Sequence, residues 1–264
     1  MTAWLAIVSL VILFPFYLVL VTALKDERRI IQNPLGLPTT WHWGNFVDAW
    51  RIGHFGIYFR NSVLVVIPTV LAVLIFSLLA AYAFAQMRFR GSNALFTLLL
   101  VGLAIPLDVL IIPLFYEMLK LQLLSTIWAL ILPQVAIGLP FGVLLLRAFI
   151  QDLPQELLDA GRIDGCNRFR LLVHVVLPLC RPALLSLLVF IFMWTWNQFL
   201  LPLVLVQSDN ARTLPIGLSF FQGRFSTDLS LLMAGVTITF VPVVLIYVVF
   251  QRQIIRGITA GAVK

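Results

Sequence analysis

Seven acidic and basic side chains lie in one segment between two long apolar runs, QELLDAGRIDGCNRFRLLVHVVLPL, which spans residues 155–179. They are Glu156, Asp159, Arg162, Asp164, Arg168, Arg170 and His174. No HExxH pattern is present, and no nucleophile stands at a telling spacing from a base. We therefore expect no catalysis, no metal and no cofactor. The segment is interpreted as a docking element for a partner protein, or alternatively as a solvated loop.

The composition around this segment indicates a membrane protein. The chain has 264 residues, of which 61% are hydrophobic and only 11% are charged. A soluble domain carries about a quarter charged residues. The net charge of this chain is +7. Because its basic residues are scattered among loops, nucleic acid is not expected as a partner. We expect one all-α transmembrane domain over residues 1–264.

Six apolar runs are long enough to cross about 30 Å of hydrocarbon as helices. They are Ala3–Leu24, Ser62–Gln86, Ser92–Leu114, Ile127–Phe149, Pro182–Val206 and Ser230–Gln251. Prolines inside these runs predict kinks. The first run is too long for a typical signal peptide, and no clean cleavage site follows it, so we expect it to be retained. The 18 lysines and arginines divide almost evenly between the two sides. Arg88 and Arg90 lie in the short hairpin between the second and third spans, and basic residues in short loops favour the cytoplasmic side. With six spans, both termini are then also cytoplasmic.

The charged segment itself predicts a helix–turn–helix over residues 152–181, between the fourth and fifth spans. Asp152 is a suitable N-cap, followed by Pro154 in the first turn of a helix that ends near Ile163. Gly165 can adopt the left-handed conformation that stops this helix. A second, amphipathic helix of about twelve residues then runs to Pro178, too short to span a membrane.

The pattern of this segment resembles the EAA loop of bacterial ATP-binding-cassette (ABC) importer permeases. The family pattern is EAA, three residues, Gly, nine residues and I-x-L-P, and it falls here on Asp159-Ala160-Gly161, Gly165 and Val175–Pro178. Asp159, Gly161 and Val175 depart from it. The strings AYAFAQMRFRG, LPFGVLLLRAFI, WNQFLLPLVL, RTLPIGL and GITAGAVK are similar to the carbohydrate branch, to which the six-span permease subunit of the maltose transporter belongs.

This resemblance implies a non-catalytic permease subunit in a bacterial cytoplasmic membrane. It implies a second homologous permease, two cytoplasmic ATP-binding subunits, an extracytoplasmic solute-binding protein and a sugar or sugar-like substrate as partners, besides membrane lipid. The chain has no GxxxxGK[ST] phosphate loop, so ATP hydrolysis is expected on another subunit. The residues implied in coupling to the ATPase are Glu156, Asp159, Ala160, Gly161, Arg162, Asp164, Gly165 and Pro178.

Two further questions concern the membrane spans. A self-contained secondary carrier is the alternative function, but such carriers usually have ionisable residues deep in their spans. Asp108 is the only acidic residue within the expected spans. We interpret it as a buried residue at a helix end and not as a coupling site. Trp194, Asn197 and Gln198 are expected near the middle of the fifth span, where they form either a sugar path or hydrogen bonds between helices. Residues 25–60 and 208–229 are expected outside, where they could meet the binding protein.

Overall fold

The structure, a computed structural model, describes residues 2–223 and 227–260, so part of the expected external segment and the end of the closing run, residues 261–264, lie outside it. The regular structure of the described residues is helical, apart from one isolated bridge between Gln222 and Thr227. This confirms an all-α chain. By contact the chain forms two compact units, residues 1–62 with 208–245 and residues 63–207 with 246–264. The expected single domain stays a prediction.

Within the described residues, four helices are long and apolar enough to cross a membrane: α1 (Thr2–Ala23), α4 (Phe55–Gln86), α7 (Trp128–Gln151) and α14 (Leu229–Ala260). α4 begins seven residues before the expected span, because Arg60 and Asn61 continue the helix instead of ending it. Pro15, Pro68, Pro133, Pro140 and Pro242 all lie inside these continuous helices.

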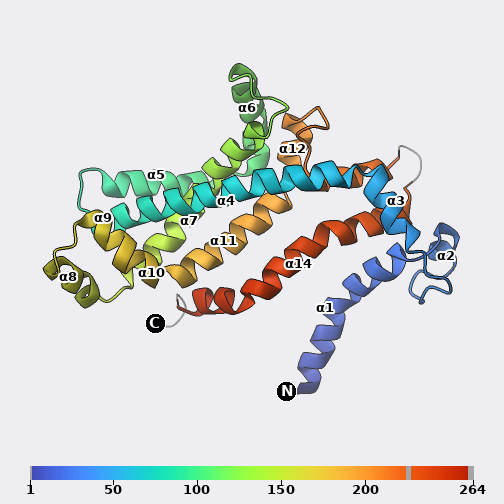
Figure 1. Cartoon of the computed structure of the whole chain (residues 1–264), viewed down its shortest axis with the longest axis horizontal. Coiled ribbons are helices and arrows are strands. Elements are labelled where there is room, and N and C mark those ends of the chain that lie inside the picture. The colour runs from blue at the N-terminus through green and yellow to red at the C-terminus, as the bar shows by residue number, and fades with distance from the viewer. Residues whose placement is uncertain (1, 224–226, 261–264) are drawn as a thin grey trace. The chain divides into compact units, whose positions relative to one another are not determined.

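The third expected span is a bent pair and not one helix. α5 (Ser92–Ala104) and α6 (Leu107–Lys120) meet at 102°, and Figure 1 shows the sharp turn between them. Ile105 is extended because the residue before a proline is disfavoured in the helical region, and Pro106 follows it. Asp108 is an exposed residue in the first turn of α6, so its expected burial was wrong.

The fifth expected span also differs from the prediction. α11 (Arg181–Trp196) ends at Asn197, and a separate short helix, α12 (Leu200–Leu205), follows. Before α11, the chain runs through α9 (Arg168–Leu171), the π-helical η1 (Leu172–Val176) and α10 (Leu177–Leu179). The axis bends by 75° between Leu179 and Arg181. Pro182 at the start of α11 fits this break because it has no N–H to continue the preceding helix.

Two glycines on α7 bring the helices of the second unit close together. A Cβ on Gly142 would lie 2.8 Å from Ser77 Cβ of α4 and 3.2 Å from Leu187 Cδ2 of α11. A Cβ on Gly138, one turn earlier, would lie 3.1 Å from Val73 Cγ2 of α4. Small residues let apolar helices approach closely, which is the main source of packing energy between helices in lipid. α7 is therefore the packing centre of this unit.

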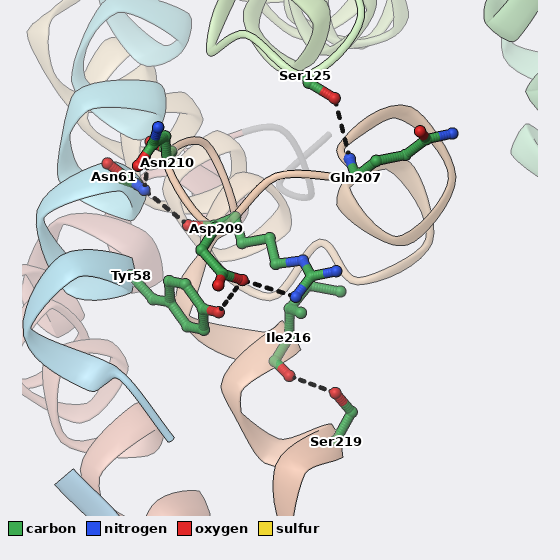
Figure 2. Close-up of polar contacts among 9 residues, drawn as sticks. Tyr58, Asn61, Ser125, Gln207, Asp209, Asn210, Ile216 and Ser219 are labelled. Carbon is green, nitrogen blue, oxygen red and sulfur yellow. Dashed lines mark hydrogen bonds and ion pairs between the residues drawn. The ribbon is translucent and has the colours of Figure 1, made fainter. Parts of the chain in front are cut away.

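The first unit contains α2 (Glu27–Gln32), α3 (Gly44–Ile52), α13 (Leu214–Gly217) and η2 (Leu218–Phe221) besides α1 and the start of α4. Figure 2 shows how α4 holds the loop after residue 208. The Asn61 side-chain amide donates to the carbonyls of Asn210 and Arg212 at 2.9 and 3.0 Å. The Tyr58 hydroxyl donates to Asp209 Oδ1 at 2.8 Å. These bonds fix the loop to the first turns of α4.

Candidate functional site

The first helix of the charged segment, α8 (Gln155–Ile163), starts later than expected. Asp152 is helical (φ −83°, ψ −3°) and its N–H donates to Ala148 O, so it ends α7 and does not cap α8. The predicted N-cap was therefore wrong. Pro154 stands at the N-cap position with φ −55° and ψ 124°, and turns the chain into α8. Glu156 lies in the first turn, where the helix dipole favours a negative charge.

The turn after α8 has the geometry that the sequence suggests. Gly165 adopts φ +82°, a left-handed conformation that glycine enters without a steric penalty. The Gly165 N–H donates to Arg162 O and the Cys166 N–H donates to Gly161 O, at 3.1 and 3.0 Å, which satisfies carbonyls at the helix end. Asn167 Oδ1 accepts from the Arg170 N–H at 2.8 Å and caps the next helix.

Gly161 has a packing role that its place in the motif does not reveal. A Cβ at this position would lie 2.7 Å from Leu171 Cδ1 and 3.3 Å from Val175 Cγ2. Gly161 and its neighbour Leu158 are buried, so α8 packs directly on α9 and η1. Glycine in place of the family's second alanine therefore permits the close contact between the two arms of the helix–turn–helix.

The opposite face of α8 is exposed and charged. Asp159 and Arg162 form an ion pair at 2.6 Å, with about half of each side chain exposed. Arg162 also donates to Gln86 Oε1 at the end of α4, at 3.5 Å. Ala160 is exposed between them, as are Asp164 and, further along, Pro178 in α10. The exposed face offers charged groups that can form ion pairs and hydrogen bonds with a partner protein. The buried face packs on α9 and η1 and holds α8 in place.

A second feature is a pocket of about 630 Å³ between α7, α11 and the start of α6. It brings together Trp194, Asn197 and Gln198, the three residues that the sequence suggested. The expected continuous helix over residues 182–206 was wrong, because α11 ends at Trp196, while the position of these three residues near the middle of the span stays a prediction. Asn197 follows the last residue of α11, Gln198 comes after it, and both line the pocket.

The pocket lining consists of three amide side chains, the hydroxyl of Thr195 and mainly apolar groups, without any ionisable side chain among its residues. The Asn197 side chain donates to Met193 O at 2.9 Å, and Gln198 Oε1 accepts from the Leu200 N–H at 3.1 Å. Trp194 is 53% exposed. An exposed indole beside amide groups can stack on the apolar face of a sugar and bond its hydroxyls.

Gln134 is a pocket residue that the sequence interpretation missed. It is 9% exposed on α7, and its Nε2 donates to Leu130 O at 3.0 Å. A single amide in the fourth apolar run was the available signal, because polar groups in membrane spans usually face a bundle interior or a cavity. Among the described residues, no group of three His, Cys, Asp or Glu could hold a metal ion.

Apolar helices of spanning length, two sharply bent helix pairs and a pocket with amide side chains indicate a multi-pass membrane protein. The chain belongs to the family described as "Binding-protein-dependent transport system inner membrane component", whose sequence model matches residues 74–260, and is thus a permease subunit of an ABC transporter. The family resemblance found in the charged segment is thereby confirmed.

Similar proteins support this assignment over the full chain. A putative ABC transporter permease from a Caldicellulosiruptor species is 38% identical over 99% of this chain and 95% of its own. An arabinooligosaccharide transport permease of Halalkalibacterium halodurans is 36% identical, covering 100% of this chain and 95% of its own. A diacetylchitobiose uptake permease of Streptomyces coelicolor is 34% identical over 97% and 85%.

The fold is also shared with a solved structure. A chain from a bacterial ABC transporter involved in the import of the acidic polysaccharide alginate matches with a TM-score of 0.81 at 21% identity. The match covers 95% of this chain and 94% of the other. The two chains therefore have the same helical architecture.

Proposed function

We propose that this chain forms half of the translocation path of an ABC importer for a neutral sugar or oligosaccharide. The observation that carries the proposal is the placement of the charged loop and the amide-lined pocket at the two ends of α11. α11 has 16 residues, which corresponds to about 24 Å of helix. A displacement of the loop is transmitted along this rigid element to Trp194 and Asn197.

In this proposal α8 is the coupling helix that docks on a cytoplasmic ATPase subunit. Its exposed face offers Glu156, Asp159, Ala160, Arg162 and Asp164, while Gly161 and Gly165 set its packing and its end. Pro178 lies in α10, directly before the bend that leads into α11. ATP hydrolysis belongs to two separate subunits, and a second permease and an extracytoplasmic binding protein complete the transporter.

The proposed topology has six spans, with each bent pair crossing once and both termini in the cytoplasm of a bacterial cell. Three basic residues on the proposed outer side have local partners. The Lys25 amine donates to Asn33 O and Pro34 O at 2.8 and 3.1 Å, and burial lowers its pKa. Lys120 pairs with Glu117, and Arg212 pairs with Asp209. The orientation is supported by Arg88 and Arg90, which are exposed in the short hairpin before α5, because basic residues in short loops favour the cytoplasmic side.

A sugar is proposed as the substrate because the pocket is uncharged and contains an exposed indole beside amides. The similarity to relatives named for arabinooligosaccharides and diacetylchitobiose supports the same class. A pocket of about 630 Å³ lies within the range of small-molecule sites.

The docking role is tested by crosslinking. A single cysteine at Ala160, in a chain that lacks Cys166 and Cys180, should crosslink to the ATPase subunit in the assembled transporter. Leu158→Cys is the matched control, because this side chain is fully buried and should not react. Equal crosslinking at both positions, or none at Ala160 in a complex that hydrolyses ATP, would remove α8 as the coupling helix.

The topology is tested by labelling from each side of the membrane. Cysteines at Ser92 and Asn210, in the same background, should react only from the cytoplasm and only from outside, respectively. Reaction at Ser92 with an impermeant reagent added outside would overturn the proposed orientation.

A further inference from the structure

The segment between α1 and α4 exposes an apolar surface that the transport path does not use. We define this outer apolar surface by its six large side chains, Leu35, Leu37, Trp41, Trp43, Val47 and Trp50, which are 44–64% exposed. The rings of Trp41 and Trp43 stack with centroids 6.3 Å apart. Exposed apolar patches of this kind indicate contact with another protein or with a membrane.

Hydrogen bonds fix the start of this surface at the end of the first span. The Asn45 amide, at the beginning of α3, donates to Ala23 O at 2.9 Å and to Lys25 O at 3.0 Å. The His42 N–H donates to Leu24 O at 3.1 Å. The last carbonyls of a helix have no partner within it, so these bonds cap α1. α3 therefore begins at the level where the first span ends.

A further bond places part of the surface nearer the hydrocarbon. The Tyr17 hydroxyl donates to Leu35 O at 3.2 Å. Tyr17 lies six residues before the end of α1 at Ala23, which corresponds to about 9 Å along the helix. The segment that contains Leu35 and Leu37 thus folds back along α1, and its exposed leucines lie at the depth of the last turns of the span.

α3 itself has the three faces of an interfacial helix. Trp43, Val47 and Trp50 are three to four residues apart and share one exposed face. Ala49 is fully buried on the inward side, and Asp48 is exposed on a third face. Helices that lie in the plane of a membrane interface combine such an apolar, tryptophan-containing face with a charged one.

We propose that the outer apolar surface lies in the lipid headgroup layer and anchors the loop between the first two spans to the membrane. Tryptophan and tyrosine are enriched at this level because their rings are apolar with one polar group. The surface is continuous with α1, of whose apolar window only 6% is buried within the chain. The partner is thus a lipid surface. A docked binding protein is the contrary outcome of the test.

The test uses the assembled transporter in lipid nanodiscs, without binding protein. Val47→Cys and Asp48→Cys are each labelled with a nitroxide in a chain that lacks Cys166 and Cys180. The two positions are adjacent but point about 100° apart on α3. The label at Val47 should collide several-fold more with oxygen and several-fold less with a water-soluble nickel chelate than the label at Asp48. Equal chelate access at both positions, or protection of Val47 only when a binding protein is added, overturns the proposal.

A second measurement avoids labels and cysteines. Tryptophan emission of the same nanodiscs is quenched by lipids brominated near the headgroup, and Trp43→Phe should remove part of the quenched emission. Trp43 is 64% exposed, so the phenylalanine variant leaves the buried packing intact. If the quenched fraction is unchanged in the folded variant, Trp43 does not face lipid and the proposal fails.

Discussion

Replacement of Gly165 by valine tests whether the turn after α8 controls coupling. Gly165 has φ +82°, and no atom lies within 4 Å of the position that a Cβ would take. The cost of a side chain is therefore local to the backbone and does not come from a clash with neighbours. A left-handed conformation costs an L-residue about 1–2 kcal/mol, and more strain is expected for a β-branched one. This corresponds to a roughly 5- to 30-fold smaller population of the native turn.

The assay is ATP-dependent uptake by the reconstituted transporter, measured beside basal ATP hydrolysis and the amount of inserted protein. Gly165→Val should lower uptake by about 5- to 30-fold if only the native turn couples, while insertion is unchanged. Gly165→Asn should retain more uptake, because asparagine tolerates this conformation. Gly91→Val is the matched control, since Gly91 has φ +83° and equally open space but lies directly before α5 and not in the turn after α8.

Normal uptake in an assembled Gly165→Val transporter would refute the role of this turn. An equal loss in Gly91→Val would show that backbone strain anywhere in the cytoplasmic loops has the same effect, and would also refute it.

Three further variants probe packing, charge and the pocket. Gly142→Ala should lower the melting temperature, because the new Cβ would lie 2.8 Å from a side-chain carbon of α4 and overpacking of this kind costs about 1–3 kcal/mol. Gly102→Ala is the control: its Cβ would lie 3.7 Å from the nearest atom, so the variant should be neutral or slightly stabilising. The hydrogen bond from Tyr58, and after it the charge of Arg212, holds the pKa of Asp209 below its usual range. Because this carboxylate has a lower pKa when folded, hydrogen-exchange protection of residues 208–213 should be present at neutral pH and fall as the pH drops through the lowered value, and Asp209→Asn should abolish that dependence. Asn197→Ala should lower sugar uptake more than melting temperature or basal ATP hydrolysis; unchanged uptake with an earlier melt would make Asn197 a structural residue only.

The sequence predicted the parts of the fold that depend on local chemistry. The apolar runs predicted the long helices, and Gly165 predicted the turn after α8, because the conformation of a glycine at a helix end depends on neighbours in sequence. The family motif located α8 even though Asp159 and Gly161 depart from it. These features need no knowledge of the tertiary structure.

The features that the sequence did not predict are the breaks within two expected spans and the contacts between distant residues. Hydropathy does not distinguish a straight span from a bent pair, so the 102° turn at Ile105–Pro106 and the end of α11 at Trp196 were not foreseen. The pocket role of Gln134 follows from the arrangement of α7 beside α11 and not from its own neighbours. The close packing at Gly161 likewise appears only when Leu171 is placed against it.

The most direct measurement is uptake of a radiolabelled neutral oligosaccharide into proteoliposomes. One preparation contains this chain with its partner permease, ATPase and binding protein, and another contains this chain alone with an imposed proton or sodium gradient. A permease subunit that couples through α8 predicts uptake only in the first preparation, and only with ATP on the side of the ATPase. Uptake by this chain alone under an ion gradient would instead make it a secondary carrier, and would contradict the role proposed here for α8.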